Sequence, residues 1–439
     1  MTRNSLCEGE GINRRILKLT VPTVLSNISV PLLALCDTAV AGHMGDEKYL
    51  AAIAVGSVMM SMTYWLFGFL RGGTSGLTAT SFGADDHDGM GKCLLRSSML
   101  GMVIGIALIC IHTPVLHLLI RVMGASEGVS HLASVYFNIC IWGAIPMMIL
   151  TALSGWFVGM QSTGKAMKVN IGVSILNVIF TLTLVYGFHF GYRGIAFGTL
   201  LAQWIIIIPA IVMALKLCRS HGIVLNPDRK LFSDAEAWKK MFGVNSNLFF
   251  RSACLIAATM TMYSCSARMG DVATGAIAVI NQLFLFFSFF MDGLAYTGEA
   301  LVGRYNGARD LRMLSLSVRQ LIKWSVCVTL LFMAVYASGL KEIAQLLTDS
   351  APVVDSVMSC QLWVVAIPAA GAAAFLYDGF YIGLTKTRPM LIATLIGVAL
   401  FVGLLFIFPR TQWLLWMSFT CYLALRSMIL VCMFGKSCR

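Results

Sequence analysis

The sequence predicts an all-α protein that crosses a membrane twelve times, with two six-helix bundles related by a pseudo-two-fold axis along the membrane normal. Composition is the first reason, because 58% of the 439 residues are hydrophobic and only 12% are charged. A soluble domain of this length needs a more highly charged surface, whereas uncharged apolar runs of about 20 residues are typical of membrane-spanning helices. An internal repeat is the second reason, and it sets the number of bundles.

The internal repeat consists of short identities that recur at one constant shift of 224 positions. The matched pairs are Ala52–Val55 with Ala276–Val279, Gly83-Ala84 with Gly307-Ala308, Asp86 with Asp310, Gly155 with Gly379, and Gly159 with Gly383; Gly45-Asp46 recurs as Gly270-Asp271 at a shift of 225. Several unrelated matches at one offset indicate a chain built twice from one unit. Two equal halves in a membrane are typical of carriers, whose lobes move about a site between them.

Apolar segments give the expected limits of the twelve spans. In the first half they lie at 16–42, 50–72, 95–121, 131–159, 167–189 and 194–217, and in the second half at 241–267, 273–303, 315–340, 354–384, 389–408 and 412–434. Some exceed the thickness of a bilayer and are expected to tilt or to extend into water. Each half has an even number of spans, so both halves begin on the same side of the membrane.

Basic residues set the expected orientation, because cytoplasmic loops are enriched in Lys and Arg. With the N-terminus inside, the outer loops hold six of the 32 basic residues: Lys48, Arg121, Arg193, Arg268, Lys341 and Arg410. Both termini are therefore expected in the cytoplasm, and the net charge of +12 is explained by the inner loops without nucleic acid. We divide the chain into an N-lobe at 1–217, a cytoplasmic linker at 218–240 and a C-lobe at 241–439.

Asp37 is the acid within the predicted spans of the first half. A carboxylate at mid-membrane costs about 2.5–3.5 kcal/mol on insertion scales, so it is expected to be compensated or functional. Pro22 and Pro31 precede it in the same span, and proline permits a helix to bend. An ionisable group beside a bendable helix suits a protonation switch. The alternative is a helix-end acid in interfacial water.

The second half carries three acids inside its predicted spans and away from the span ends. Asn281, Asp292, Tyr296 and Glu299 follow one another at spacings of 11, 4 and 3, which places them on one side of a helix. Lipid cannot solvate such a face, so it is expected to line a water-filled cavity, where Asp292 contacts a cation, or to form a structural polar seam. Asp378 is a further candidate contact, with snorkelling to the interface as the alternative.

Neutral polar residues form two further faces in the first half. Asn177 and Thr181 are four residues apart in one span, and Thr199 and Gln203 are four apart in the next. Such pairs either bond neighbouring helices together or contact a transported ion or substrate, and the spacing alone is compatible with both.

Several motifs resemble those of the multidrug and toxic compound extrusion (MATE) exporters, and most closely those of their DinF-like bacterial branch. They are Leu25–Leu33 followed by Asp37–Val40 and Gly42-His43, Asp292-Gly293 with Ala295-Tyr296, Tyr305–Asp310, and Asp378-Gly379 with Ile382-Gly383. The resemblance covers essentially the whole chain. It implies antiport of drugs or organic cations against protons or sodium, by two lobes that alternate between inward- and outward-open states.

The resemblance also implies roles for particular residues. The acid in the family's first span corresponds to Asp37, the Asn in its fifth span to Asn177, and a Thr in its sixth span to Thr199. Many relatives carry an Asp four residues after that Asn, where this chain has Thr181. The site formed by these residues of the first half would thus have one carboxylate where relatives often have two. This weakens the case for sodium coordination and for a two-acid proton relay.

We therefore expect an exporter of amphipathic, cationic compounds in the bacterial inner membrane, driven by protons and acting as a monomer, and not an enzyme. Coupling is assigned to Asp37, Asn177, Thr181 and Thr199, and substrate binding to Asp292, Glu299, Tyr296, Asn281, Gln203 and Asp378. No cofactor or metal is expected beyond the transported H⁺ or Na⁺, and no nucleic acid.

Two alternative functions are weighed against this expectation. A lipid-linked saccharide flippase would need many basic residues deep in its spans, and this sequence has few. A polytopic membrane transferase would need acid clusters such as DxxxD or a sizeable catalytic loop, and the sequence contains neither. A Walker motif is also missing, so ATP is not expected to drive transport directly.

Overall fold

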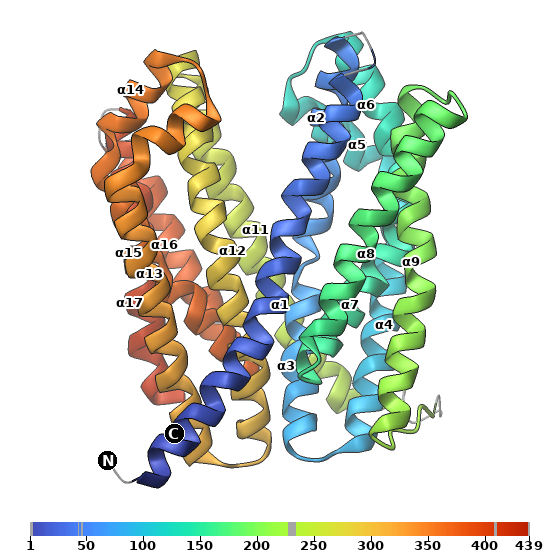
Figure 1. The fold of residues 1–439 in the computed structure, drawn as a ribbon, viewed down its shortest axis with the longest axis vertical. Coiled ribbons are helices and arrows are strands. Elements are labelled where there is room, and N and C mark those ends of the chain that lie inside the picture. The colour runs from blue at the N-terminus through green and yellow to red at the C-terminus, as the bar shows by residue number, and fades with distance from the viewer. Residues whose placement is uncertain (1–2, 43, 45–46, 227–233, 408–410, 438–439) are drawn as a thin grey trace. The chain divides into compact units, whose positions relative to one another are not determined.

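The computed structural model describes residues 3–42, 44, 47–226, 234–407 and 411–437, and these residues are almost entirely helical (Figure 1). They form two compact units, Leu25–Trp238 and Met1–Val24 with Lys239–Arg439. The beginning of the chain, up to Val24, therefore belongs with the second half. Both boundaries between the units fall within helices, α1 (Arg3–Gly42) and α11 (Ala235–Ala267).

The unit Leu25–Trp238 contains the later part of α1 and the helices up to α9. These are α2 (Glu47–Leu66), α3 (Phe69–Gly83), α4 (His87–Cys110), α5 (His112–Met123), α6 (Glu127–Cys140), the 3₁₀ turn η1 (Ile141–Gly143), α7 (Ala144–Gly159), α8 (Thr163–Leu182), the π-helical turn η2 (Thr183–Gly187) and α9 (Tyr192–Ser220). Its core is apolar and close-packed, with Phe137, Trp156 and Phe157 fully buried.

The other unit contains the first part of α1 and the helices from α11 onwards. After α11 these are α12 (Asp271–Gly307), α13 (Leu311–Leu347), α14 (Ala351–Ser359), α15 (Gln361–Gly383), α16 (Arg388–Ile407) and α17 (Gln412–Ser437). Aromatic rings fill the space between its helices. Phe287 of α12 and Phe332 of α13 lie 5.4 Å apart, and Phe284 of α12 and Phe419 of α17 lie 5.3 Å apart, both edge to face.

The expected fold class, an all-α polytopic membrane protein, is confirmed. Eleven helical segments in the described part of the chain are long and apolar enough to cross a membrane, and they correspond to the second to twelfth predicted spans. The first predicted span lies within the 40-residue α1. No β-strand occurs among the described residues.

Some predicted spans differ from the observed helices in their limits. The second continues beyond 72 to Gly83, because the small residues of α3 let it pack closely against α7. The third, predicted at 95–121, covers the end of α4 and most of α5, with a break at Ile111. The tenth, predicted at 354–384, covers most of α14 and the whole of α15, with a break at Cys360 between them.

The internal repeat is visible in the backbone as well as in the sequence. Asp86 caps α4 by accepting a hydrogen bond from the Gly89 N–H at 2.8 Å, and Asp310 caps α13 by accepting one from the Met313 N–H at 2.9 Å. Each cap follows a residue of positive φ, Asp85 at 56° and Arg309 at 54°. Asp86 and Asp310 are related by the shift of the repeat, as are Asp85 and Arg309, so both turns are duplicated. Gly45-Asp46, part of the weaker match, lies outside the described residues.

Close helix contacts at glycines also occur twice, once in each unit. A Cβ at Gly159 of α7 would lie 2.7 Å from the Ser75 carbonyl oxygen of α3, and one at Gly383 of α15 would lie 2.9 Å from the Glu299 carbonyl oxygen of α12. Gly155 and Gly379 approach α3 and α12 still more closely, at the carbonyls of Arg71 and Ala295. Gly155 and Gly379 are related by the shift of the repeat, as are Gly159 and Gly383. The residues whose carbonyls they contact are related by the same shift.

Candidate functional site

Three of the residues predicted to couple ion movement form one hydrogen-bonded chain between α8 and α9. The Thr181 hydroxyl donates to Asn177 Oδ1 at 3.5 Å, the Asn177 amide donates to Thr199 Oγ1 at 2.7 Å, and Thr199 donates to the Ile195 carbonyl at 3.2 Å. Asn177 and Thr181 are each only 1% exposed. Gly198 allows this approach, because a Cβ there would lie 2.7 Å from the Thr181 nitrogen.

Asp37, the fourth predicted coupling residue, belongs to the same unit as that chain. It is 6% exposed, and its Oδ1 has no hydrogen-bond partner within the described ranges. Tyr136 and Cys140 of α6 lie close enough to interact electrostatically with its carboxylate, and the Tyr136 hydroxyl is also directed towards Thr199. Tyr136 is therefore near both the acid of α1 and the amide–hydroxyl chain.

Gln203 extends this cluster, although the sequence assigned it to substrate binding. It lies one turn after Thr199 on α9, is 6% exposed, and its Oε1 is unpartnered in the part of the chain that the structure describes. Its amide packs against the backbone of Gly143 in η1, where a Cβ would overlap it. Gln203 is therefore in the unit of Asp37, whereas the other predicted substrate residues are in the second unit.

The predicted polar stripe lies on α12, with unequal burial along it. Glu299 is 1% exposed, whereas Asp292, Tyr296 and Asn281 are half-buried. The Asn281 amide donates to the Tyr263 hydroxyl of α11 at 3.0 Å. Asn281 thus bonds two helices together in this state, and Asp292 and Tyr296 are the members of the stripe that combine partial exposure with charge or an aromatic face.

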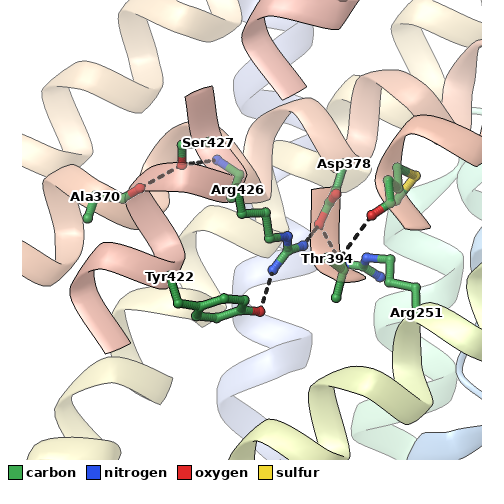
Figure 2. A network of polar contacts seen from close by, with 9 residues as sticks. Arg251, Ala370, Asp378, Thr394, Tyr422, Arg426 and Ser427 are labelled. Carbon is green, nitrogen blue, oxygen red and sulfur yellow. Dashed lines mark hydrogen bonds and ion pairs between the residues drawn. The ribbon is translucent and has the colours of Figure 1, made fainter. Parts of the chain in front are cut away.

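Asp378 of α15 joins three helices (Figure 2). Its Oδ2 accepts from the guanidinium groups of both Arg251 on α11 and Arg426 on α17. Arg426 also donates to the Tyr422 hydroxyl at 3.4 Å. The side chains of the acid and Arg426 are 7% and 4% exposed, and that of Arg251 is 18% exposed. We call these three charged residues the Arg–Asp–Arg cluster.

Sequence analysis identified Asp378 but missed Arg426 and Tyr136. Arg426 lies 14 residues after the start of α17 at Gln412, about 21 Å along the helix, so it is far from that helix end. The available signal is its setting in an apolar run, Leu423-Ala424-Leu425 before it and Met428–Val431 after it. Tyr136 offers no comparable signal, because one tyrosine in an apolar helix is usual at a core position.

The fold and the buried polar clusters define a class, that of polytopic membrane transporters with two duplicated halves. Comparison with known proteins identifies the family. The MatE family model matches residues 22–183 and 248–407, and the chain belongs to that family. It is 30% identical over 431 residues to DNA damage-inducible protein F of Escherichia coli, covering 97% of this chain and 93% of that protein.

Two further similarities extend over most of the chain. A probable multidrug resistance protein NorM of Geobacillus kaustophilus is 22% identical over 406 residues, covering 89% of this chain and 87% of that protein. A crystal structure of MATE in the bent conformation matches the whole of both chains with a TM-score of 0.85 at 18% identity. That likeness shows the fold.

Proposed function

We propose that this protein is a proton-coupled secondary exporter of amphipathic, cationic small molecules that works by alternating access. Family membership supports transport, and the probable multidrug resistance relatives support the substrate class. Asp37 supports the coupling, because burying a carboxylate inside a membrane protein costs free energy. Such a group is typical of sites where a change of charge has a function. The distribution of Lys and Arg supports a bacterial inner membrane location with both termini in the cytoplasm.

In the proposed cycle, Asp37 carries the proton. Protonation from the outer side removes its charge and converts the carboxyl group from an acceptor into a donor. Its electrostatic interaction with Tyr136 then changes, and the chain through Thr199 and Asn177 transmits that change to α8 and α9. Bending of α1 lowers the affinity for substrate, which leaves outwards. Release of the proton to the cytoplasm resets the site.

A proton suits the site of Asp37 better than a sodium ion. Hard cations bound by proteins are held by several oxygen ligands, usually including more than one carboxylate. The cluster around Asp37 supplies one carboxylate, since Thr181 occupies the position where many relatives carry a second. The remaining oxygens, those of Asn177, Thr181 and Thr199, are neutral ligands, and binding a cation would compete with the hydrogen bonds between them.

For the substrate, we propose contacts on α12 and around it. Asp292 provides a negative charge and Tyr296 an aromatic face, the two features that recognise an organic cation. Asn281, Gln203 and the buried Glu299 are proposed to shape and polarise the binding surfaces of the two units. The 26 Met and 26 Phe side chains suit a surface that accepts apolar bodies of varied shape.

Replacement of the coupling acid tests this function most simply. Asp37→Asn preserves shape but cannot release a proton, so it should reduce gradient-driven efflux at least about 100-fold, within the range attributed to positioned acid–base groups. Asp355→Asn, at an exposed acid of α14, is the matched control and should transport like the wild type. Both are measured with a fluorescent cation in proteoliposomes. Full transport by Asp37→Asn would refute the assignment.

A further inference from the structure

The Arg–Asp–Arg cluster has an excess of positive charge deep inside its unit. Arg251 lies 16 residues from each end of α11, about 24 Å along the helix either way. Arg426 and Asp378 are more than nine-tenths buried. Two guanidinium groups contact a single carboxylate oxygen, so with all three groups ionised the net charge is +1 (Figure 2).

The cluster also has hydrogen-bonding atoms that the described protein atoms leave unused. The Nε of Arg251, the Nε of Arg426 and the Oδ1 of Asp378 are buried without a partner in the described part of the chain. Buried donors of this kind are rare in folded proteins, where each usually has an acceptor. Two of the three atoms are donors of cationic groups, which an acceptor that carries negative charge would satisfy best.

Two hydroxyl groups lie on the face of α17 that carries Arg426. Ser418, Tyr422 and Arg426 follow one another at intervals of four residues, which puts them on one face of the helix. All three are buried, and Ser418 Oγ has no partner among the described residues. Tyr422 accepts from Arg426, which leaves its own O–H able to donate. This face of α17 thus adds donors, and no acid occurs in the helix from Gln412 to Ser437.

The duplicated fold does not require these charges. One repeat length earlier in the chain, the positions of Arg251, Asp378 and Arg426 are occupied by Asn27, Ser154 and Ala202. The other unit thus has neutral residues at the corresponding positions, and Ser154 and Ala202 are buried there as Asp378 and Arg426 are here. Three buried charges usually stabilise a helix contact no better than apolar side chains of similar volume do, because the charges lose their hydration. The charges therefore serve recognition.

We propose that the Arg–Asp–Arg cluster is a binding site for one monovalent anion, either an inorganic ion such as chloride or the carboxylate of a small organic acid. The anion neutralises the excess charge and accepts from the unused guanidinium donors. Arginine forks match planar carboxylates well, and chloride accepts from the same donors without a preferred plane. A cation site at Asp378 is disfavoured, because both neighbours of this acid repel a cation. The proposal is independent of proton coupling at Asp37.

Charge variants give opposite predictions for an anion site and a cation site. Purified protein in a chloride-free sulfate buffer is titrated calorimetrically with sodium chloride, choline chloride and sodium acetate. Saturable binding of chloride with either cation, or of acetate, is expected. Asp378→Asn removes the competing negative charge and should tighten binding at least about tenfold. Arg426→Gln and Arg251→Gln should each weaken it at least about tenfold.

Two controls separate this result from other effects. Arg96→Gln removes a buried arginine that is paired with Asp234 outside the cluster, and should bind the anion like the wild type. Asp37→Asn should also leave anion binding unchanged, so failure of antiport and failure of this site are distinguishable. If an arginine variant does not fold, Asp378→Asn still decides the matter. No saturable binding to the wild type and Asp378→Asn, or weaker binding by Asp378→Asn, would overturn the proposal. A comparison of chloride with acetate then identifies the class of anion.

Discussion

At the scale of single residues, Asn177 is the centre of the polar cluster in the first unit. It accepts from Thr181, donates to Thr199 and is 1% exposed, so water cannot replace its amide. Its position links the two helices that the proposed cycle has to move together. Sequence analysis assigned Asn177, Thr181 and Thr199 to the coupling site, and the structure joins the three residues by direct hydrogen bonds. Their role in coupling remains a proposal.

Removal of the Asn177 amide should lower stability measurably. Asn177→Ala leaves the buried Thr181 hydroxyl and the half-buried Thr199 hydroxyl without this partner, which should cost about 1–3 kcal/mol. The midpoint of thermal unfolding in detergent measures the loss. Asn170→Ala is the control on the same helix, because Asn170 bonds Ser26 at 2.8 Å but is partly exposed, so water can compensate. Equal midpoints for Asn177→Ala and Asn170→Ala would contradict this account.

Individual residues also mark the limit of prediction from sequence. Asp37 and Asp378 could be found because an acid in an apolar run is rare. Arg426 lies within the predicted span at 412–434, but the local sequence does not indicate its partner. Only the contact between α15 and α17 reveals that Asp378 has two arginine partners. Pairing between Asp378 and Arg426, which are far apart along the chain, has no local signature in the sequence.

At the scale of helices, duplicated glycines set the closest contacts of the fold. Gly379 of α15 lies against the carbonyl of Ala295 on α12, and its counterpart Gly155 lies against Arg71 on α3. Two of the identities that revealed the repeat are therefore glycines at which the packing leaves no room for a side chain. This explains why the sequence could predict the duplication, whereas the breaks at Ile111 and at η2 left no comparable pattern.

Enlarging one of these glycines should separate two helices. Gly379→Ala forces a methyl group against a backbone carbonyl that cannot rotate away, and should destabilise the protein by at least about 1–3 kcal/mol. Gly403→Ala, at a glycine of α16 where an added methyl group would have no described atom within 4 Å, should be neutral or stabilising by up to about 1 kcal/mol. Thermal unfolding compares the two variants, and an equal effect of both would be inconsistent with this packing.

The start of α11 is fixed by an ion pair whose strength depends on pH. Asp234 accepts from the Ala237 N–H at 3.1 Å and from Arg96 at 2.9 Å, and these contacts lower the pKa of its carboxyl group. The backbone hydrogen bond is the larger cause and the Arg96 side chain the next. Asp234 is thereby joined to α4 within one unit, and Trp238 lies over the same guanidinium at 5.9 Å.

The sign of the pH effect follows from the lowered pKa. A group whose pKa is lower in the folded protein than in the unfolded chain stabilises the fold above its unfolded pKa, about 3.9 for Asp. That stabilisation is lost as the pH falls through the folded pKa. The difference in unfolding midpoint between wild type and Asp234→Asn should therefore be constant above about pH 5. Below about pH 4 this difference should decrease towards zero. A difference that persists unchanged at lower pH would exclude this role.

At the scale of the whole molecule, each unit combines duplicated packing with polar residues that are not duplicated. Thr261 stands 224 positions after Asp37, and Ser154 stands 224 positions before Asp378. Equivalent turns and glycine contacts therefore support different chemistry in the two units. The scaffold could be predicted from repetition and hydrophobicity. The polar sites could be predicted only in part, since their partners come from different helices.

The most direct test of the central claim is transport of a fluorescent organic cation by the wild-type protein in proteoliposomes, with a pH gradient and a sodium gradient imposed separately. An inward-directed proton gradient alone should drive export of the cation, and a sodium gradient alone should not exceed the rate without any gradient. Transport driven by sodium alone would contradict proton coupling at Asp37, and no transport under either gradient would contradict a secondary exporter.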